Sequence, residues 1–145
     1  MPEKKTLARA RKAKQEGKAA STQAGAFVHE EIEHVREGKH GARSAKQAIA
    51  IGLSKARRAG VKLEPPKKGA TSARTRARAK RDVATGAKKK TTRKSPARAR
   101  AASRALKHEG RAAASPRALS RQARAAARRR KPTTKKRTVR REKTT

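Results

Sequence analysis

The sequence predicts a mostly α-helical protein, in which a small helical hairpin is followed by a long basic tail that is largely disordered or conditionally helical. Two observations predict this architecture. Apolar residues recur at helical spacing in two adjacent segments within residues 21–64. Nine of the 14 Leu, Ile, Val and Phe residues lie between Phe27 and Leu63, so any apolar core is small and lies there. We therefore divide the chain into a basic N-terminal arm (1–20), the hairpin (21–64) and a Lys/Arg/Ala-rich basic tail (65–145).

The N-terminal arm mixes Lys, Arg and Ala. Residues 6–16 are compatible with a short helix that Gly17 would end. They show no clean apolar face, so we expect this arm to be frayed in solution.

The first helix of the hairpin is predicted for residues 21–38. Its apolar stripe consists of Ala24, Phe27, Val28, Ile32 and Val35, with Glu31 intruding on it. The other side carries an acidic edge, and this edge is either a docking site for the basic tail or another protein, or a solvated face that keeps the hairpin soluble. We favour the solvated face. The edge consists of Glu30, Glu33 and Glu37.

The second helix of the hairpin, residues 44–60, has the clearest local pattern. Ser44 and Gln47 form a capping-box pattern, and Gly60 stands where a helix C-terminal cap is expected. Pro65 and Pro66 prevent further helix. One stripe carries small and apolar side chains, which would let the partner helix approach closely. The stripe consists of Ala45, Ala48, Ile49, Gly52, Leu53 and Ala56.

The tail contains three segments that resemble basic helices. Residues 72–85 are predicted to form one that ends at Gly86, and residues 87–94 to be unstructured. The other two segments each begin with a Ser-Pro pair, which is typical of a capped helix start. One begins at Ser95-Pro96 and ends at Gly110; the other begins at Ser115-Pro116 and ends before Pro132. Like charges at i,i+4 oppose these helices by about 0.2–0.5 kcal/mol per pair. We therefore expect these segments to be coil in the free chain and to become helical when they bind phosphate groups.

Charge is the strongest functional signal. The chain holds 45 Lys and Arg against 10 Asp and Glu, and the tail alone has 30 against three, a net charge of +27. Such a field attracts polyanions, and its expected ligand is the phosphate backbone of double-stranded DNA, with RNA as the alternative. The expected phosphate-binding residues are Arg74, Arg76, Arg78, Lys88, Lys89, Lys90, Arg98, Arg100, Arg104, Arg121, Arg124, Arg128, Arg129, Arg130, Lys135, Lys136 and Arg140.

Several function classes are disfavoured. The chain has no cysteine, so Cys-based zinc sites are excluded. His29 and His34 are spaced i,i+5, about 140° apart on a helix, and this spacing does not chelate one ion; we expect no metal and no cofactor. Glu30 is expected to pair with His34, while His40 and His108 are expected to be solvated. An enzyme is not expected, because there is too little apolar mass to build the walls of a catalytic pocket.

Two resemblances add to this reading. KQAIAIGLSKARRAGVKL (46–63), with AFVHEEIEHVREGKHGARS (26–44) before it, resembles a family of small, largely uncharacterised bacterial proteins, some of which carry DNA-binding or plasmid-stabilisation labels. That resemblance covers residues 1–68. The C-terminal half is similar to bacterial linker-histone-like proteins in its Lys/Arg/Ala/Pro composition and its Ser-Pro-basic pattern. Neither resemblance implies catalytic residues.

The expected function is non-sequence-specific DNA binding and compaction, as in nucleoid-associated or histone-like proteins. The expected location is the cytoplasmic nucleoid, since the longest apolar run (48–51) is too short to span a membrane. An RNA-binding or ribosome-associated protein is one alternative. An adaptor whose hairpin recruits a DNA-maintenance protein is the other.

Self-association through the hairpin is also expected. Two short helices bury little surface, and Ile51 lies about 160° round the helix from Ile49, off the packing stripe. We expect a homodimer through Ile49, Ile51 and Leu53. The alternative is that Ile51 packs within one chain, under Val61, Leu63 or the N-terminal arm.

Overall fold

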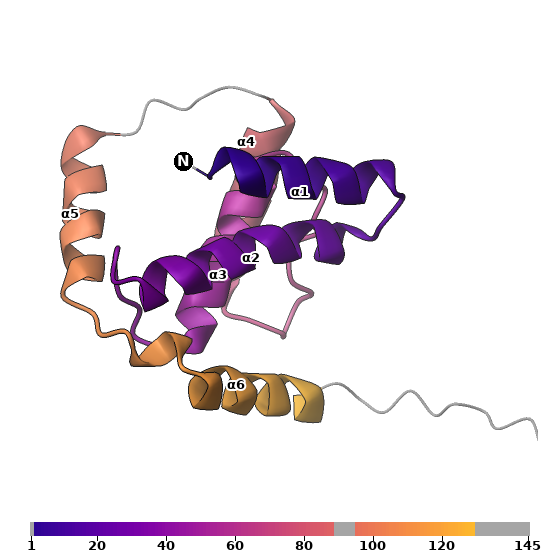
Figure 1. Ribbon diagram of the computed structural model, residues 1–145. Helices are drawn as coiled ribbons and strands as arrows, with labels where there is room; N and C mark the ends of the chain where they lie inside the picture. The colour runs from indigo at the N-terminus through magenta and orange to yellow at the C-terminus, as the bar shows by residue number, and fades with distance from the viewer. Residues whose placement is uncertain (1, 89–94, 130–145) are drawn as a thin grey trace, which may run out of the picture.

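The structure is a computed structural model that describes residues 2–88 and 95–129 (Figure 1). The prediction of a mostly helical protein is confirmed for these residues. Within these two ranges, no helix is long and apolar enough to cross a membrane. The elements in chain order are α1 (Lys4–Gln15), α2 (Ala20–Arg36), α3 (Ala45–Arg58), α4 (Ala73–Ala87), α5 (Pro96–Lys107), the short 3₁₀ helix η1 (Ala112–Ala114) and α6 (Pro116–Arg129).

The helix α3 has the caps that its sequence predicts. Ser44 Oγ accepts a hydrogen bond from Gln47 N at 3.2 Å, and Gln47 Oε1 accepts one from Arg43 N at 2.8 Å, one residue before the cap. Gly60 follows the C-terminal cap with φ of +93°, a conformation that favours glycine. Local sequence therefore fixes both ends of this helix.

The helices α2 and α3 approach each other at Gly52. A Cβ atom placed on Gly52 would lie 2.7 Å from Val28 Cα and 3.0 Å from Phe27 O, so only glycine permits this spacing. Phe27 and Val35 are fully buried on the α2 side of the contact. The predicted small-residue stripe of α3 is thus confirmed at its alanines and glycine, whereas Ile49 and Leu53 are only half-buried.

The helix α1 packs along α2, and the expectation of a frayed N-terminal arm is wrong (Figure 1). Thr6 and Ala10 are buried, and Leu7 packs against the cluster around Phe27. This face consists mainly of small side chains, so it produces little hydrophobic periodicity in the sequence. It is nevertheless sufficient for a close helix contact.

The helix α4 packs on α3 through Asp82. Ser54 Oγ donates a hydrogen bond to Asp82 Oδ2 at 2.7 Å, and Arg58 Nε lies 3.7 Å from Asp82 Oδ1. Ser54 and Arg58 are one helical turn apart on α3, so a single carboxylate of α4 binds both.

The chain between α3 and α4 folds back on α3 around Arg57. Its Nε donates to Leu63 O at 3.2 Å and its Nη2 donates to Glu64 O at 3.3 Å. Burial lowers the pKa of the Arg57 guanidinium, and the charge of Asp82 opposes this shift. The fold-back places Val61 in the cluster around Phe27.

A second apolar cluster joins the hairpin to η1. Val35, Ala42 and Ala48 pack with Ala113 and Ala114. The expectation that any apolar core lies between Phe27 and Leu63 is therefore wrong. The contact is made by alanines, which a count of large apolar residues ignores. The boundaries expected at residues 20 and 64 do not separate packed from unpacked chain.

Backbone hydrogen bonds strengthen this connection. Gly41 N donates to Leu106 O at 2.8 Å, and Ala42 N donates to Gly110 O at 3.1 Å. The turn between α2 and α3 is thereby paired with the last turn of α5 and with the chain that links α5 to η1.

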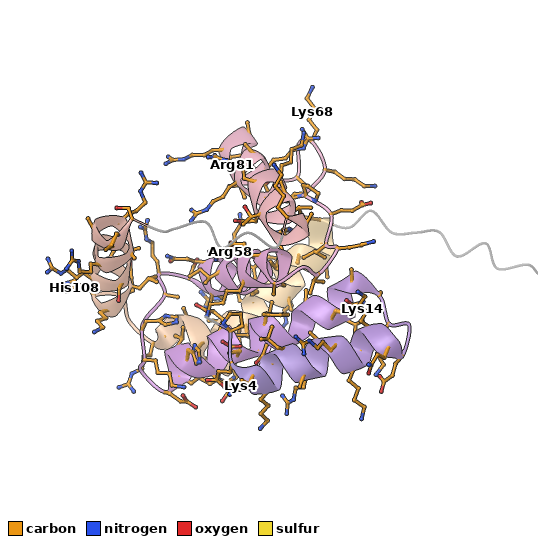
Figure 2. All side chains as sticks on the ribbon, turned by 90° about the horizontal axis from the view of Figure 1, so that it is seen from above. Lys4, Lys14, Arg58, Lys68, Arg81 and His108 are labelled. Carbon is orange, nitrogen blue, oxygen red and sulfur yellow. The ribbon has the colours of Figure 1, made fainter. Side chains whose placement is uncertain are left out.

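The helix α5 itself contacts no other helix among residues 2–88 and 95–129. Figure 1 shows it beside the body formed by α1–α4, connected through η1. Its C-terminal His108 projects away from the body in Figure 2. All residues of α5 are solvent-exposed except Leu106, which is half-buried.

The three basic segments are helices, whereas we expected coil in the free chain; α4 and α6 pack on other helices, and this tertiary packing supports them against like-charge repulsion. Ser72 Oγ accepts from Thr75 N, and Ser115 Oγ accepts from Ala118 N, each at 3.2 Å; Ser95 makes no such bond. The ends differ by one to three residues from the predicted ones: α4 reaches Ala87 and α5 ends at Lys107. Of the segment 87–94 that was expected to be unstructured, residues 89–94 lie outside the described residues.

We predict that Gly52→Ala destabilises the protein by about 1–3 kcal/mol, because the added methyl meets rigid backbone of α2. Gly25→Ala is the matched control. Gly25 lies inside α2, and a Cβ there meets nothing within 4 Å, so this change should be neutral or stabilise by up to about 1 kcal/mol. Urea denaturation followed by circular dichroism measures both variants. Equal stabilities of the two would contradict the close approach.

Candidate nucleic-acid interface

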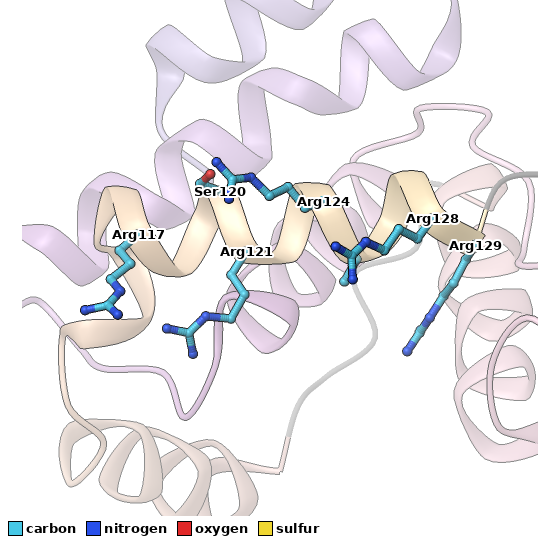
Figure 3. Close-up of a pocket in the computed structure, with 7 residues that line it drawn as sticks. Arg117, Ser120, Arg121, Arg124, Arg128 and Arg129 are labelled. Carbon is cyan, nitrogen blue, oxygen red and sulfur yellow. The ribbon is translucent and has the colours of Figure 1, made fainter.

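The helix α6 carries a stripe of four arginines. Arg117, Arg121, Arg124 and Arg128 are spaced i, i+4, i+7 and i+11, so they fall within about 60° of the helix circumference over roughly 16 Å. All four are exposed. Together with Ser120, Ala125 and Arg129 they line an open depression. Figure 3 shows Arg117 and Arg121 extending to one side, with Arg124 reaching back toward Ser120.

The opposite side of α6 faces the protein body. Ala118, Leu119 and Gln122 are half-buried, and α6 packs against η1 and α3. The arginine stripe is therefore directed to solvent because the helix docks through its alanine and leucine side.

The same spacing recurs on the two preceding helices. On α4 the stripe consists of Arg74, Arg78 and Arg81, and on α5 it consists of Arg100, Arg104 and Lys107; all six residues are exposed. Of the predicted phosphate-binding residues in the described chain, four lie off the three stripes: Arg76, Lys88, Arg98 and Arg129. Arg98 is on the other side of α5, and Arg76 donates from Nε to Pro66 O at 3.2 Å. Arg76 therefore has a structural contact as well as a charge.

No carboxylate among residues 2–88 and 95–129 forms an ion pair with any residue of the three stripes. The acidic residues of the described C-terminal half contact the hairpin instead: Asp82 contacts α3, and Glu109 lies 3.6 Å from Arg43 Nε. Like charges one turn apart repel each other and oppose each helix. A polyanion would relieve this repulsion, which is the electrostatic property expected of a phosphate-binding surface.

A shallow groove lies between α6 and the first turn of α3. Four basic residues line it: Arg43 and Lys46 beside the N-terminus of α3, and Arg117 and Arg121 from α6. The positive end of the α3 dipole adds to their charge. The packing of η1 brings these two helices together, so the groove links two positive regions that are distant in the sequence.

The predicted phosphate-binding residues divide into two sets. Those within the described chain are Arg74, Arg76, Arg78, Lys88, Arg98, Arg100, Arg104, Arg121, Arg124, Arg128 and Arg129. Those outside the described residues are Lys89, Lys90, Arg130, Lys135, Lys136 and Arg140. The prediction omitted Arg81, Lys107 and Arg117, which complete the stripes and which the i, i+4, i+7 spacing would have indicated. It also omitted Arg43 and Lys46, which only the packing places near α6.

The expected self-association residues do not form one exposed patch. Leu53 packs against the cluster around Phe27. Ile51 is half-buried and shares a face of α3 with Ser54 and Arg58, both of which contact Asp82 of α4. The helix α4 is thus an intramolecular neighbour of this face, which neither alternative of the sequence analysis included.

The expected acidic edge of α2 is also divided. Glu30 is buried, whereas Glu33 pairs with Arg36 at 2.9 Å. Glu37 lies 2.9 Å from Lys39 Nζ, and this hydrogen bond is the main reason that the pKa of Lys39 is raised. Only two of the three carboxylates therefore face solvent, and each has a local basic partner.

Residues 11–68 match the model of a family of unknown function, DUF6496. The matched segment contains all of α2 and α3 and the end of α1, but none of the three stripes. The chain matches no curated protein and no solved structure.

Proposed function

We propose that the protein binds double-stranded DNA through its phosphate backbone, without sequence preference, and compacts it in the bacterial nucleoid. The main supporting observation is the set of three exposed basic stripes on α4, α5 and α6, which have no acidic partners in the described chain. Duplex DNA carries about one phosphate charge per 1.7 Å of axis, so the roughly 16 Å stripe of α6 can face several phosphates at once.

Duplex rather than single-stranded nucleic acid is favoured by the position of the only aromatic residue. Phe27 has an exposed fraction of 0% in the core. Proteins that bind single strands stack bases on exposed aromatic side chains, and this chain has none to offer. Binding must therefore depend on the backbone, whose charge density is highest in a duplex.

Compaction requires contacts with more than one DNA segment. The stripes lie on three helices, and α5 stands beside the body while α6 lies across the end of α3 (Figure 1). Separate basic surfaces on one molecule can bind two duplexes, and linkage of the surfaces raises the effective concentration for the second contact. A single chain can then bridge DNA segments.

We predict that affinity for duplex DNA falls steeply with salt, with a log–log slope steeper than about −4. Replacing Arg117, Arg121, Arg124 and Arg128 by Gln should reduce the steepness of this slope by about 3 to 4, since each lost phosphate contact contributes about 0.9. Fluorescence anisotropy of a labelled duplex across a salt series measures the slope for the full-length protein.

The matched control replaces Arg9, Arg11, Lys12 and Lys14 of α1 by Gln. These residues are also exposed and carry the same total charge, so the overall field changes equally. We expect the control to change the slope by less than half as much. Equal effects of the two variants would mean that net charge, rather than the stripe, determines binding.

RNA is the principal alternative ligand, and competition separates the two. We expect unlabelled duplex DNA to displace a labelled DNA duplex at lower concentration than a structured RNA with equal phosphate content. Stronger displacement by the RNA would favour an RNA-binding or ribosome-associated function instead.

An adaptor is the second candidate function, because the matched family segment ends at residue 68, before the stripes. In that case the hairpin would recruit a DNA-maintenance protein, and the α6 stripe would be dispensable for the biological effect.

A homodimer through the hairpin stays a prediction. Sedimentation velocity of the full-length protein without DNA measures it, and a dimer should accumulate as the concentration rises to the high micromolar range. A monomer throughout that range would mean that bridging depends on the stripes of one chain, with α4 covering the face of Ile51.

A further inference from the structure

Three side chains that can bind a metal meet at the end of α2. Glu31 and His34 lie one turn apart on α2, and His40 comes from the turn before α3. One potential ligand atom from each residue lies within 4.8 Å of the other two. In the sequence, only His29 and His34 are spaced closely enough to suggest a ligand pair, and helical geometry separates them. His40 is expected from the sequence to be solvated, whereas its side chain is only 18% exposed.

The orientation of His40 is fixed by the backbone. Its Nδ1 lies 3.1 Å from Gly41 O, and a carbonyl oxygen only accepts, so Nδ1 donates this bond. The other ring nitrogen, Nε2, lies 3.1 Å from Glu31 Oε1. In a neutral imidazole this nitrogen carries a lone pair that faces a carboxylate oxygen, so a proton or another cation must lie between them. Metal-binding histidines commonly donate their second nitrogen to a carbonyl in this manner.

Glu31 is a buried carboxylate with its two oxygens in different environments. Its side chain is 1% exposed, with Oε1 directed to His40 and Oε2 lying 2.5 Å from Lys55 Nζ without hydrogen-bond geometry. Oε1 is therefore available to a cation on the histidine side while Lys55 remains on the other side.

The surroundings carry a local excess of negative charge. Glu30 is also buried, lies 3.8 Å from the same Lys55, and its Oε1 accepts no hydrogen bond among the described residues. Lys39 lies near Glu3 and Glu37. Four carboxylates thus share two lysines within a chain whose net charge is +35. Buried carboxylates need compensation, and a further positive charge at the histidines would supply it.

Glu3 supplies a fourth potential ligand atom, a second carboxylate oxygen, beside His34. Its Oε1 lies 3.0 Å from His34 Nε2, and the hydrogen bond from His34, followed by that from Lys39, lowers the pKa of the Glu3 carboxyl. This pairing differs from the expected one between Glu30 and His34. The His34 and His40 rings lie edge to face with their centroids 6.0 Å apart.

We propose that Glu31, His34 and His40 bind a divalent transition-metal ion of the Zn²⁺ class, with Glu3 or water as the fourth ligand. Two imidazoles and one carboxylate are a ligand set that suits zinc, whereas Mg²⁺ and Ca²⁺ prefer oxygen ligands throughout. Tetrahedral bonds of about 2.0–2.1 Å place ligand atoms about 3.3 Å apart. The His40 and Glu31 atoms already have nearly this separation, and no other pair of ligand atoms must shorten by more than about 1.5 Å.

The turn that carries His40 can accommodate this closure. It contains Gly38, with φ of +76°, and Gly41. A bound ion would join α2 to this turn, and the turn is also paired with Leu106 and Gly110 of the C-terminal half. The ion would therefore stiffen the junction between the hairpin and the chain that leads to η1 and α6. This inference is independent of the proposed DNA binding.

Isothermal titration calorimetry of the full-length, tag-free protein with Zn²⁺, after removal of bound nucleic acid, tests the site. We expect one tight ion per chain, and at least about tenfold weaker binding for His34→Gln and for His40→Gln. His29→Gln and His108→Gln are the matched controls, since both histidines are exposed and lie outside the cluster. Neither control should change the affinity.

Co²⁺ absorption provides a second measurement. Tetrahedral coordination gives intense visible bands, which should be present in the controls and lost in His34→Gln and His40→Gln while circular dichroism shows that these variants remain folded. The absence of tight Zn²⁺ binding, or equal weakening by control and cluster variants, would overturn the proposal and leave His40 as a partner of Glu31 and His34 as a partner of Glu3.

Discussion

The close contact of α2 and α3 at Gly52 is the constraint on which the rest of the structure depends. The chain has few large apolar side chains, so it gains cohesion by bringing backbones together and burying alanines. Glycine has the same role at the two other junctions. A Cβ on Gly41 would collide with the carbonyl of Glu109, and one on Gly86 with that of Arg57. Small residues thus attach the C-terminal half to the hairpin.

Acidic and basic side chains occupy different parts of this fold. Among the carboxylates of α2, Glu30 and Glu31 are buried and share Lys55, and Glu33 forms a local ion pair with Arg36. The arginines of α4, α5 and α6 are directed outward without such partners in the described chain. The hairpin, residues 21–64, therefore has a net charge of only +3, and the strong positive field is presented by the C-terminal helices.

The two proposals rest on opposite electrostatic features. DNA binding depends on exposed, uncompensated arginines, whereas the metal site depends on buried, undercompensated carboxylates. The α6 stripe and the metal site are connected through the turn between α2 and α3, which carries His40 and is paired with the chain leading to η1. An ion bound by Glu31, His34 and His40 would fix the junction that positions α6 beside α3, without contacting DNA itself.

The sequence by itself determined α3 with both caps, the hairpin, the starts of the C-terminal helices and the basic field, because these depend on neighbouring residues or on composition. It did not determine the docking of α1, the packing of Ala113 and Ala114 on Val35, or the grouping of Glu31, His34 and His40. Alanine has high helix propensity but a weak periodic signal, so its burial is visible only when the partner surface is present. The histidine cluster likewise requires a turn to return His40 to α2, and that geometry is a property of the tertiary structure alone.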